Sequence, residues 1–183
     1  MPWKNGGGET AEIAVSPGGA ALAQFDWRIS MARVAADGPF SGFPGVDRTL
    51  AVVAGAGLRL SVHGHAPVDL RDDSPPIAFP GDVATHGALI GGEVLDFNVM
   101  TRRGRHEHSV RRVRVAASTV DAPLPSANLV FCQEGAIDVQ SGNQRDRLER
   151  HDSLLRDDVT GPWRMSSESG ATLLVVSIEG SRR

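Results

Sequence analysis

The sequence has little cysteine, no tyrosine and no long apolar run. Cys132 is the only cysteine. A single thiol excludes an internal disulfide and a zinc site built from several cysteines, so we expect a reducing, cytoplasmic location. The longest apolar runs, "LAVVAGAG" and "ATLLVVSI", are far shorter than the roughly 20 residues that a membrane helix needs. The first residues also lack the apolar stretch of a secretory signal, so we expect neither a membrane span nor a signal peptide.

The chain also lacks an excess of positive charge. Its 183 residues carry a formal net charge of −3, which gives no overall attraction to nucleic acid or to anionic lipid. One segment, residues 100–115, is locally basic, with six arginines and two histidines. Such a segment is typical either of a nucleic-acid patch or of a solvated edge strand guarded by charge. The acidic net charge and the lack of aromatic residues in the segment favour the edge strand. We therefore expect neither nucleic acid nor a membrane as a partner.

Alternation of apolar and polar residues is the dominant pattern in the chain. In "FDWRISM", Asp26, Arg28 and Ser30 separate four apolar residues that we expect in the core, namely Phe25, Trp27, Ile29 and Met31. "GLRLSVH" and "LDFNVMT" alternate in the same way, while "ATLLVVSIE" is apolar enough for a strand buried on both faces. No stretch sustains the period of an amphipathic helix for three turns. The sequence predicts an all-β protein.

The chain also repeats one order of elements. Residues 49–82 contain an apolar strand, a glycine turn, an alternating strand, a short polar strand and a final apolar strand. Residues 127–158 follow a similar order. Two β-units of one design, with a seam between about residues 102 and 125, fit a pair of packed jelly-roll barrels. We place the two halves at residues 1–103 and 104–183.

Several long blocks of sequence resemble the HutD/Ves family of small bacterial proteins. These blocks are "MPWKNGGGET", "FDWRISMARVAADGPFSGFPGVDRTL", "FPGD" and "DFNVMTRR", and they cover residues 2–103 closely. The second half resembles the family only in pattern. The resemblance implies a bicupin, that is, two jelly-roll (double-stranded β-helix) barrels of the cupin type. It implies a link to histidine utilization or to environmental stress, with a regulatory role and no settled reaction. It also leaves a homodimer open, because cupins commonly pair their barrels edge to edge.

A histidine motif raises the question of a metal. His63, Gly64 and His65 follow Gly57 at the spacing of a cupin metal motif, with His86 further along the chain. The alternation places His63 opposite the apolar face of its strand, and Gly64 is typical of a hairpin turn. The later part of the motif is missing from "FPGDVATH". We therefore expect no metal and no other cofactor.

Charged and amide residues of the family blocks favour recognition of an anion instead. The guanidinium fork of arginine matches a carboxylate in two hydrogen bonds, and lysine adds a compact charge. The glycines after Asn5 allow close approach of the backbone to a ligand. We expect a pocket in the first barrel, with an arginine at its rim. Its candidate ligand-binding residues are Trp3, Lys4, Asn5, Arg28, Arg48, Asp96 and Asn98. The alternative is that these charged residues lie on solvent-exposed faces of strands.

Three functions are compatible with these features. The leading hypothesis is a non-catalytic protein that binds a small anionic metabolite, for which the resemblance makes histidine-breakdown intermediates the natural candidates. The first alternative is a cupin enzyme, either metal-dependent at His63 and His65 or a metal-free isomerase or lyase with Asp96 or Glu93 as base. The second alternative is an interaction protein that uses the arginine-rich strand.

Overall fold

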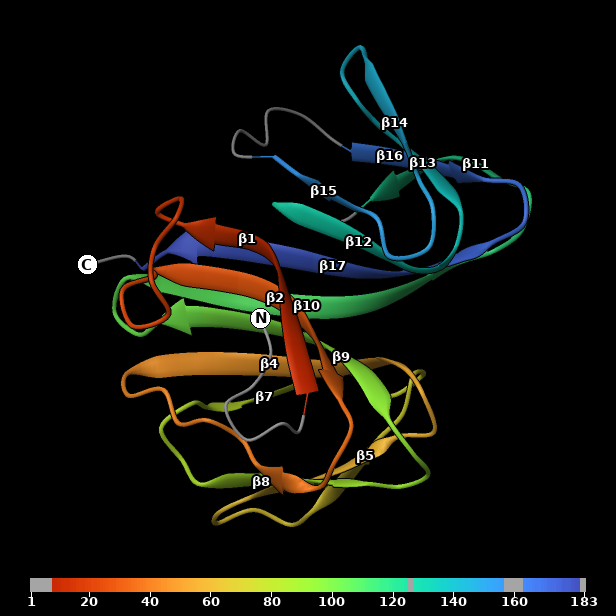
Figure 1. Cartoon of the computed structure of the whole chain (residues 1–183). Coiled ribbons are helices and arrows are strands. Elements are labelled where there is room, and N and C mark those ends of the chain that lie inside the picture. The colour runs from red at the N-terminus through yellow and green to blue at the C-terminus, as the bar shows by residue number, and fades with distance from the viewer. Residues whose placement is uncertain (1–7, 125–126, 157–162, 182–183) are drawn as a thin grey trace. The chain divides into compact units, whose positions relative to one another are not determined.

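The computed structural model describes residues 8–124, 127–156 and 163–181 (Figure 1). Its regular secondary structure within these ranges consists of β-strands only, which confirms the predicted all-β class. In the same ranges, no helix is long and apolar enough to cross a membrane.

The chain divides into two compact units. The first unit consists of the residues up to His108 and of those from Glu179 onward. The second unit is Ser109–Ile178. The boundary placed at residues 103 and 104 from the sequence lies in the turn between β9 (Val94–Arg102) and β10 (His106–Val115), a little before the division in the structure.

The first unit contains two antiparallel sheets. In spatial order, the strands of the larger sheet are β1 (Gly8–Ser16), β2 (Trp27–Val34), β9 (Val94–Arg102), β4 (Val46–Ala54) and β7 (Ile77–Pro80). The strands of the smaller sheet are β3 (Gly38–Pro39), β8 (Thr85–Leu89), β5 (Leu58–Val62) and β6 (Val68–Leu70).

The core of this unit lies between its two sheets. Leu50 and Val52 of β4 belong to the same buried cluster as Leu58 and Leu60 of β5. Arg59, between the two leucines of β5, is exposed, as the alternation predicts. Burial of these aliphatic side chains stabilises the unit, by about 1.5–3 kcal/mol for each one that is fully buried.

Strand β2 differs from the prediction. Ile29 is buried as expected, but Trp27 and Met31 are only half-buried. Arg28 and Ser30 on the opposite face are buried as well, so the strand is covered on both faces. The alternation of "FDWRISM" identifies a strand but cannot distinguish a solvent face from a polar face that points into the unit, because both contain polar residues.

The second unit repeats the design. One sheet contains β10 (His106–Val115), β17 (Ala171–Gly180), β12 (Leu129–Gly135) and β15 (Ser153–Leu155). The other contains β11 (Thr119–Leu124), β16 (Trp163–Ser167), β13 (Ile137–Ser141) and β14 (Gln144–Leu148). Strand β10, which begins in the first unit, is an edge strand of its sheet, as predicted for the arginine-rich segment.

The core of the second unit is apolar. Trp163, Val130 and Leu173 lie in its central cluster, and β17 is buried on both faces at its centre, as predicted. Cys132 lies in the same cluster, and burial raises the pKa of its thiol to about 11. The thiol is therefore a small apolar filler at neutral pH rather than a nucleophile.

Two glycines with a left-handed backbone allow a test of how tightly the first unit is packed. Gly55 has φ +101°, and a Cβ atom there would lie 2.6 Å from the carbonyl oxygen of Glu93. Gly64 has φ +84°, but a Cβ atom there would meet nothing within 4 Å. Alanine strains the backbone at both positions, by about 1–2 kcal/mol, and only at Gly55 does it also overlap a neighbouring strand.

We therefore predict that Gly55→Ala lowers the free energy of unfolding more than Gly64→Ala does, by at least about 1 kcal/mol. Urea unfolding followed by circular dichroism measures the difference. Equal losses for the two variants would show that the approach of the chain to Glu93 is not a constraint.

Candidate functional site

A polar patch lies on the face of the larger sheet that points into the core of the first unit. Residues opposite each other on paired antiparallel strands point to the same side of a sheet. Met100 of β9 pairs with Arg28 of β2 on one side and with Arg48 of β4 on the other. The next two rows of this face contain Ser30, Asn98 and Leu50, and then Ala32, Asp96 and Val52. Because Leu50 and Val52 belong to the core, the polar side chains of these rows also point inward.

Three of the polar side chains form a hydrogen-bonded chain. Arg48 Nη2 donates to Asn98 Oδ1 at 2.9 Å, and Asn98 Nδ2 donates to Asp96 Oδ1 at 2.8 Å. Asp96 is 0% exposed, and Arg48 and Asn98 are each 4% exposed. The Asn98 amide thus separates a buried cation from a buried anion and hydrogen-bonds to both, which is the condition for tolerating charge in a core.

Aromatic rings surround the Arg48 guanidinium. Its central carbon lies 5.3 Å from the ring centroids of Phe40 and Phe79 and 5.5 Å from that of Phe43. Gly81 leaves room for the side chain, because a Cβ atom there would lie 3.2 Å from Arg48 Cγ and Cδ. Cation–π attraction is stronger when the cation is removed from water. The rings therefore help to hold Arg48 in place inside the unit.

Arg28 lies in the same row as Arg48 but has a different partner. Arg28 Nε donates to Glu12 Oε2 at 2.8 Å, and its Nη1 lies 3.4 Å from Ser30 Oγ. Glu12 is 37% exposed, so this pair connects the patch to the surface. We expected one of the two arginines at the rim of a pocket, whereas both are 4% exposed.

Burial shifts the protonation equilibria of the patch. It raises the pKa of Asp96 to about 7, against the opposing effects of the Arg48 charge and the hydrogen bonds from Asn98 and the Ala32 backbone. It lowers the pKa of Arg48 to about 10, so Arg48 remains a cation at neutral pH. Within the described residues, three buried polar atoms of the patch have no hydrogen-bond partner, namely Asp96 Oδ2, Arg48 Nε and Arg28 Nη2.

Apolar clusters enclose the patch along the strands. Val52 and Phe79 belong to the main core, and Phe25, Val46 and Met100 form a second buried cluster. An ion next to Arg48 would therefore lie largely out of water, where its electrostatic interactions are strong.

On the opposite face of the same strands, His108 connects β4 to β9. Its Nε2 lies 2.9 Å from Thr49 Oγ1, and its Nδ1 lies 2.7 Å from Thr101 Oγ1. Burial lowers the pKa of His108, so the neutral ring is favoured and can donate to one threonine and accept from the other. His108 therefore links β4 and β9, the strands of Arg48, Asn98 and Asp96, through hydrogen bonds on the face opposite the patch.

Of the seven candidate residues, the structure joins Arg48, Asn98 and Asp96 by hydrogen bonds. Arg28 lies on the same face of the sheet, on the neighbouring strand β2. Trp3, Lys4 and Asn5 lie outside the described residues. Sequence reasoning did not assign a role to Ser30, Gly81 or the three phenylalanines. The quoted family blocks contain all of them, and only the fold shows that these blocks meet at Arg48.

Asp96, one base of the enzyme alternatives, lies in the patch, whereas His63, His65 and Glu93 lie elsewhere in the first unit. His63 and His65 are exposed, on a turn that contains Gly64 as predicted. Of the residues that the structure describes, no three or more His, Cys, Asp or Glu side chains are grouped to hold a metal ion. Glu93 is 54% exposed, and its Oε2 lies 2.5 Å from Arg33 Nη2. This hydrogen bond lowers the pKa of Glu93 and so weakens Glu93 as a base.

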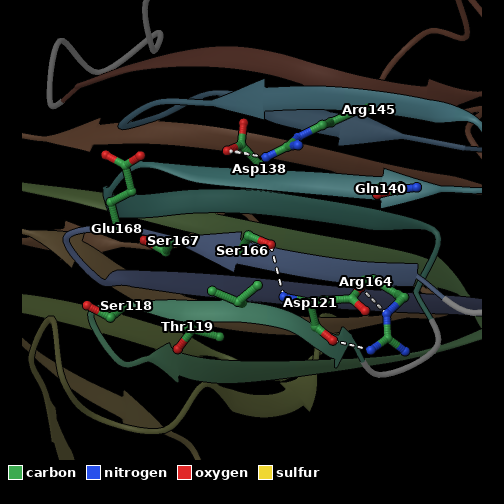
Figure 2. Close-up of a pocket in the computed structure, with 11 residues that line it drawn as sticks. Ser118, Thr119, Asp121, Asp138, Gln140, Arg145, Arg164, Ser166, Ser167 and Glu168 are labelled. Carbon is green, nitrogen blue, oxygen red and sulfur yellow. Dashed lines mark hydrogen bonds and ion pairs between the residues drawn. The ribbon is translucent and has the colours of Figure 1, made fainter.

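A concavity lies on the second unit. It has a volume of about 550 Å³ and is lined by polar residues of β11, β13, β14 and β16 and of the turns beside them (Figure 2). Its charged groups largely pair with one another: Arg145 with Asp138, and Arg164 with Asp121 (Figure 2). Among the described residues, no side chain that lines the concavity has a buried polar atom without a hydrogen-bond partner, in contrast to Arg48 and Asp96 of the first unit.

Two units of paired antiparallel sheets define a two-barrel cupin. The chain belongs to the HutD family, whose model matches residues 1–175. An uncharacterized 21.2 kDa protein in the hutC 3′ region of Pseudomonas putida is 36% identical over 169 residues, covering 88% of this chain and 87% of that protein. Protein Ves of Citrobacter koseri is 36% identical over 135 residues, covering 73% of this chain and 68% of that protein.

Solved structures agree with this assignment. A conserved protein of unknown function from Pseudomonas aeruginosa PAO1 superposes with a TM-score of 0.87 at 35% identity, covering 98% of this chain and 93% of that one. HutD from Pseudomonas fluorescens SBW25, solved in a formate condition, superposes with a TM-score of 0.76 at 32% identity. This match covers 98% of this chain and 94% of that one. A salicylate 1,2-dioxygenase from Pseudoaminobacter salicylatoxidans shares the fold alone. It is 13% identical and superposes with a TM-score of 0.65, covering 95% of this chain and 81% of that one.

The raised pKa of Asp96 predicts how stability depends on pH. An aspartate in the unfolded chain has a pKa near 3.9, and in the folded protein that of Asp96 is about 7. Folding therefore favours the protonated acid, and the stability that this contributes is lost as pH rises from about 4 through 7. Relative to Asp96→Asn, which cannot ionise, the wild-type free energy of unfolding should fall by about 2–3 kcal/mol between pH 5 and pH 8.

Urea unfolding of the two proteins at both pH values measures this difference. Asp69→Asn is the matched control, because Asp69 is paired with exposed Arg59 and its pKa is lowered, out of this pH window. An Asp96→Asn variant that follows the wild-type pH profile would mean that Asp96 is already ionised throughout the range.

Proposed function

We propose that the first unit binds a small anionic metabolite, with a carboxylate of the ligand held by Arg48. The observation that carries this proposal is the buried Arg48 guanidinium, whose Nε has no partner among the described residues. A buried N–H group without an acceptor is costly, by about 1–3 kcal/mol and more for a charged group. A carboxylate that accepts from Arg48 would remove this penalty and add charge-assisted hydrogen bonds.

Other groups of the patch suit the same ligand. Arg28 provides a second buried N–H group without a partner, Nη2, on the same face of the sheet. Asn98 can bind a polar group of a ligand while it orients Arg48. The seven candidate residues predicted from the sequence remain our proposal for the ligand-binding set, with Lys4 as a further cation.

Family membership suggests the class of ligand and the physiological role. One relative is encoded in a hutC region, and another was solved in a formate condition. We propose that the ligand is a carboxylate intermediate of histidine breakdown and that the protein is a cytoplasmic regulator of histidine utilization or of a stress response. Regulation requires only reversible binding, for which the site needs no metal and no nucleophile.

Asp96 supports one second candidate, a metal-free isomerase or lyase. A general base is most effective when its pKa lies near the working pH, and the pKa of Asp96 is about 7. Proton NMR of urocanate and of N-formylglutamate incubated with the protein distinguishes the two functions. An unchanged spectrum supports binding without reaction, and new signals that disappear with Asp96→Asn would establish catalysis.

Ligand-induced thermal stabilisation tests the proposed function. We expect sodium formate, N-formylglutamate and urocanate to raise the melting temperature of the first unit, whereas formamide and other neutral analogues have little effect. A ligand at 100 times its dissociation constant adds about 2.7 kcal/mol of stability, which such an assay detects. The absence of any shift with carboxylates at millimolar concentration would contradict the proposal.

A pair of variants locates the binding. Arg48→Met keeps an unbranched apolar stem among the phenylalanines but removes the guanidinium, so we expect loss of the carboxylate-dependent shift. Arg59→Met is the control, because Arg59 forms an exposed pair with Asp69 on the outer face of the same unit. Equal ligand responses in the two variants would place the anion away from Arg48.

A further inference from the structure

The inward-facing charges among the described residues of the first unit can be counted strand by strand. Beside Asp96 on β9, β2 contributes Arg28 and β4 contributes Arg48. The facing strands β5 and β8 of the smaller sheet contribute only uncharged residues, which are Leu58, Leu60, Val62, Thr85, Gly87 and Leu89. Strand β7 adds Ile77 and Phe79, which are also uncharged.

These charges balance. Arg28 is compensated by Glu12 at 2.8 Å, and Arg48 is compensated through Asn98 by Asp96. Among the described residues, an anion that joins Arg48 would add a second negative charge beside that cation, next to buried apolar clusters. An uncompensated buried charge is strongly unfavourable, and a protein relieves it by changing the protonation state of a group.

Asp96 is the group whose protonation can remove this uncompensated charge. Its carboxyl is fully buried, and Oδ2 has no partner among the described residues, so a proton can reside there without breaking the hydrogen bond from Asn98 to Oδ1. We propose that the first unit takes up its anionic ligand together with one proton, which binds to Asp96. This inference rests on the proposed function and specifies the ionic form of the complex.

The exchange is neutral overall. Before binding, Arg48 is balanced by the Asp96 carboxylate; after binding, it is balanced by the carboxylate of the ligand, and Asp96 is a neutral acid that has taken one proton from solvent. Because the pKa of Asp96 is already about 7 in the free protein, this protonation requires little free energy near neutral pH. Affinity should therefore fall as pH rises above 7, and a neutral analogue should show no such dependence.

The test is the apparent Kd for sodium formate at pH 6.5, 7.5 and 8.5, from NMR chemical-shift titrations at constant ionic strength. Formate is fully ionised over this range. For one proton per anion, the wild-type Kd should rise about tenfold between pH 7.5 and 8.5. Asp96→Asn, a neutral mimic of the protonated acid, should give a nearly constant Kd and bind formate at least about tenfold more tightly than wild type at pH 8.5. Asp69→Asn should keep the wild-type profile.

The outcomes separate this inference from the proposed function. If wild type binds formate with the same Kd at all three pH values, proton uptake is wrong and anion binding stands. If wild type does not bind formate at any pH, both fail. If Asp96→Asn does not fold, calorimetry of wild type with N-formylglutamate at pH 7.5, in phosphate and in Tris buffer, still counts protons: uptake of between half and one proton per ligand is expected, and zero uptake overturns the inference.

Discussion

The chain of hydrogen bonds from Arg48 through Asn98 to Asp96 determines what the first unit can do. An isolated charge in this interior would be strongly unfavourable without a partner. One amide that accepts from the cation and donates to the anion lets both reside there. The balance is incomplete, because both groups keep a polar atom without a partner among the described residues and burial shifts both pKa values towards the neutral forms. Groups in this condition respond strongly to an incoming charge.

The fold supplies the surroundings for that chain. Pairing of β9 with β2 and β4 places the polar rows side by side, and His108 fastens β4 to β9 from the opposite face. Phe40, Phe43 and Phe79 enclose the guanidinium, and Gly81 leaves space for its stem. In the second unit, Arg156 lies over the Trp163 ring of the core but pairs directly with Asp146 at 2.7 Å, with no amide between the two charges.

The sequence predicts much of this architecture for clear reasons. Alternation in "GLRLSVH" and "LDFNVMT" identifies strands and their faces because the period of a strand is two residues. The same rule does not show which face is exposed in "FDWRISM" and "LDFNVMT", because the polar residues Arg28, Ser30, Asp96 and Asn98 are buried as well. A local pattern shows which residues share a face but not what covers that face. The meeting of Phe40, Phe79 and Gly81 at Arg48 depends on pairing between distant strands, which no local window contains.

The central claim is that Asp96 is the exchangeable counter-charge of Arg48. The most direct measurement is the titration of the Asp96 side-chain carboxyl by ¹³C NMR, with the resonance assigned by its loss in Asp96→Asn. Our account predicts a midpoint of about 7 in the free protein and a clearly higher midpoint when sodium formate is saturating. A midpoint near 4, the usual range for aspartate, that does not move when formate is added would contradict it.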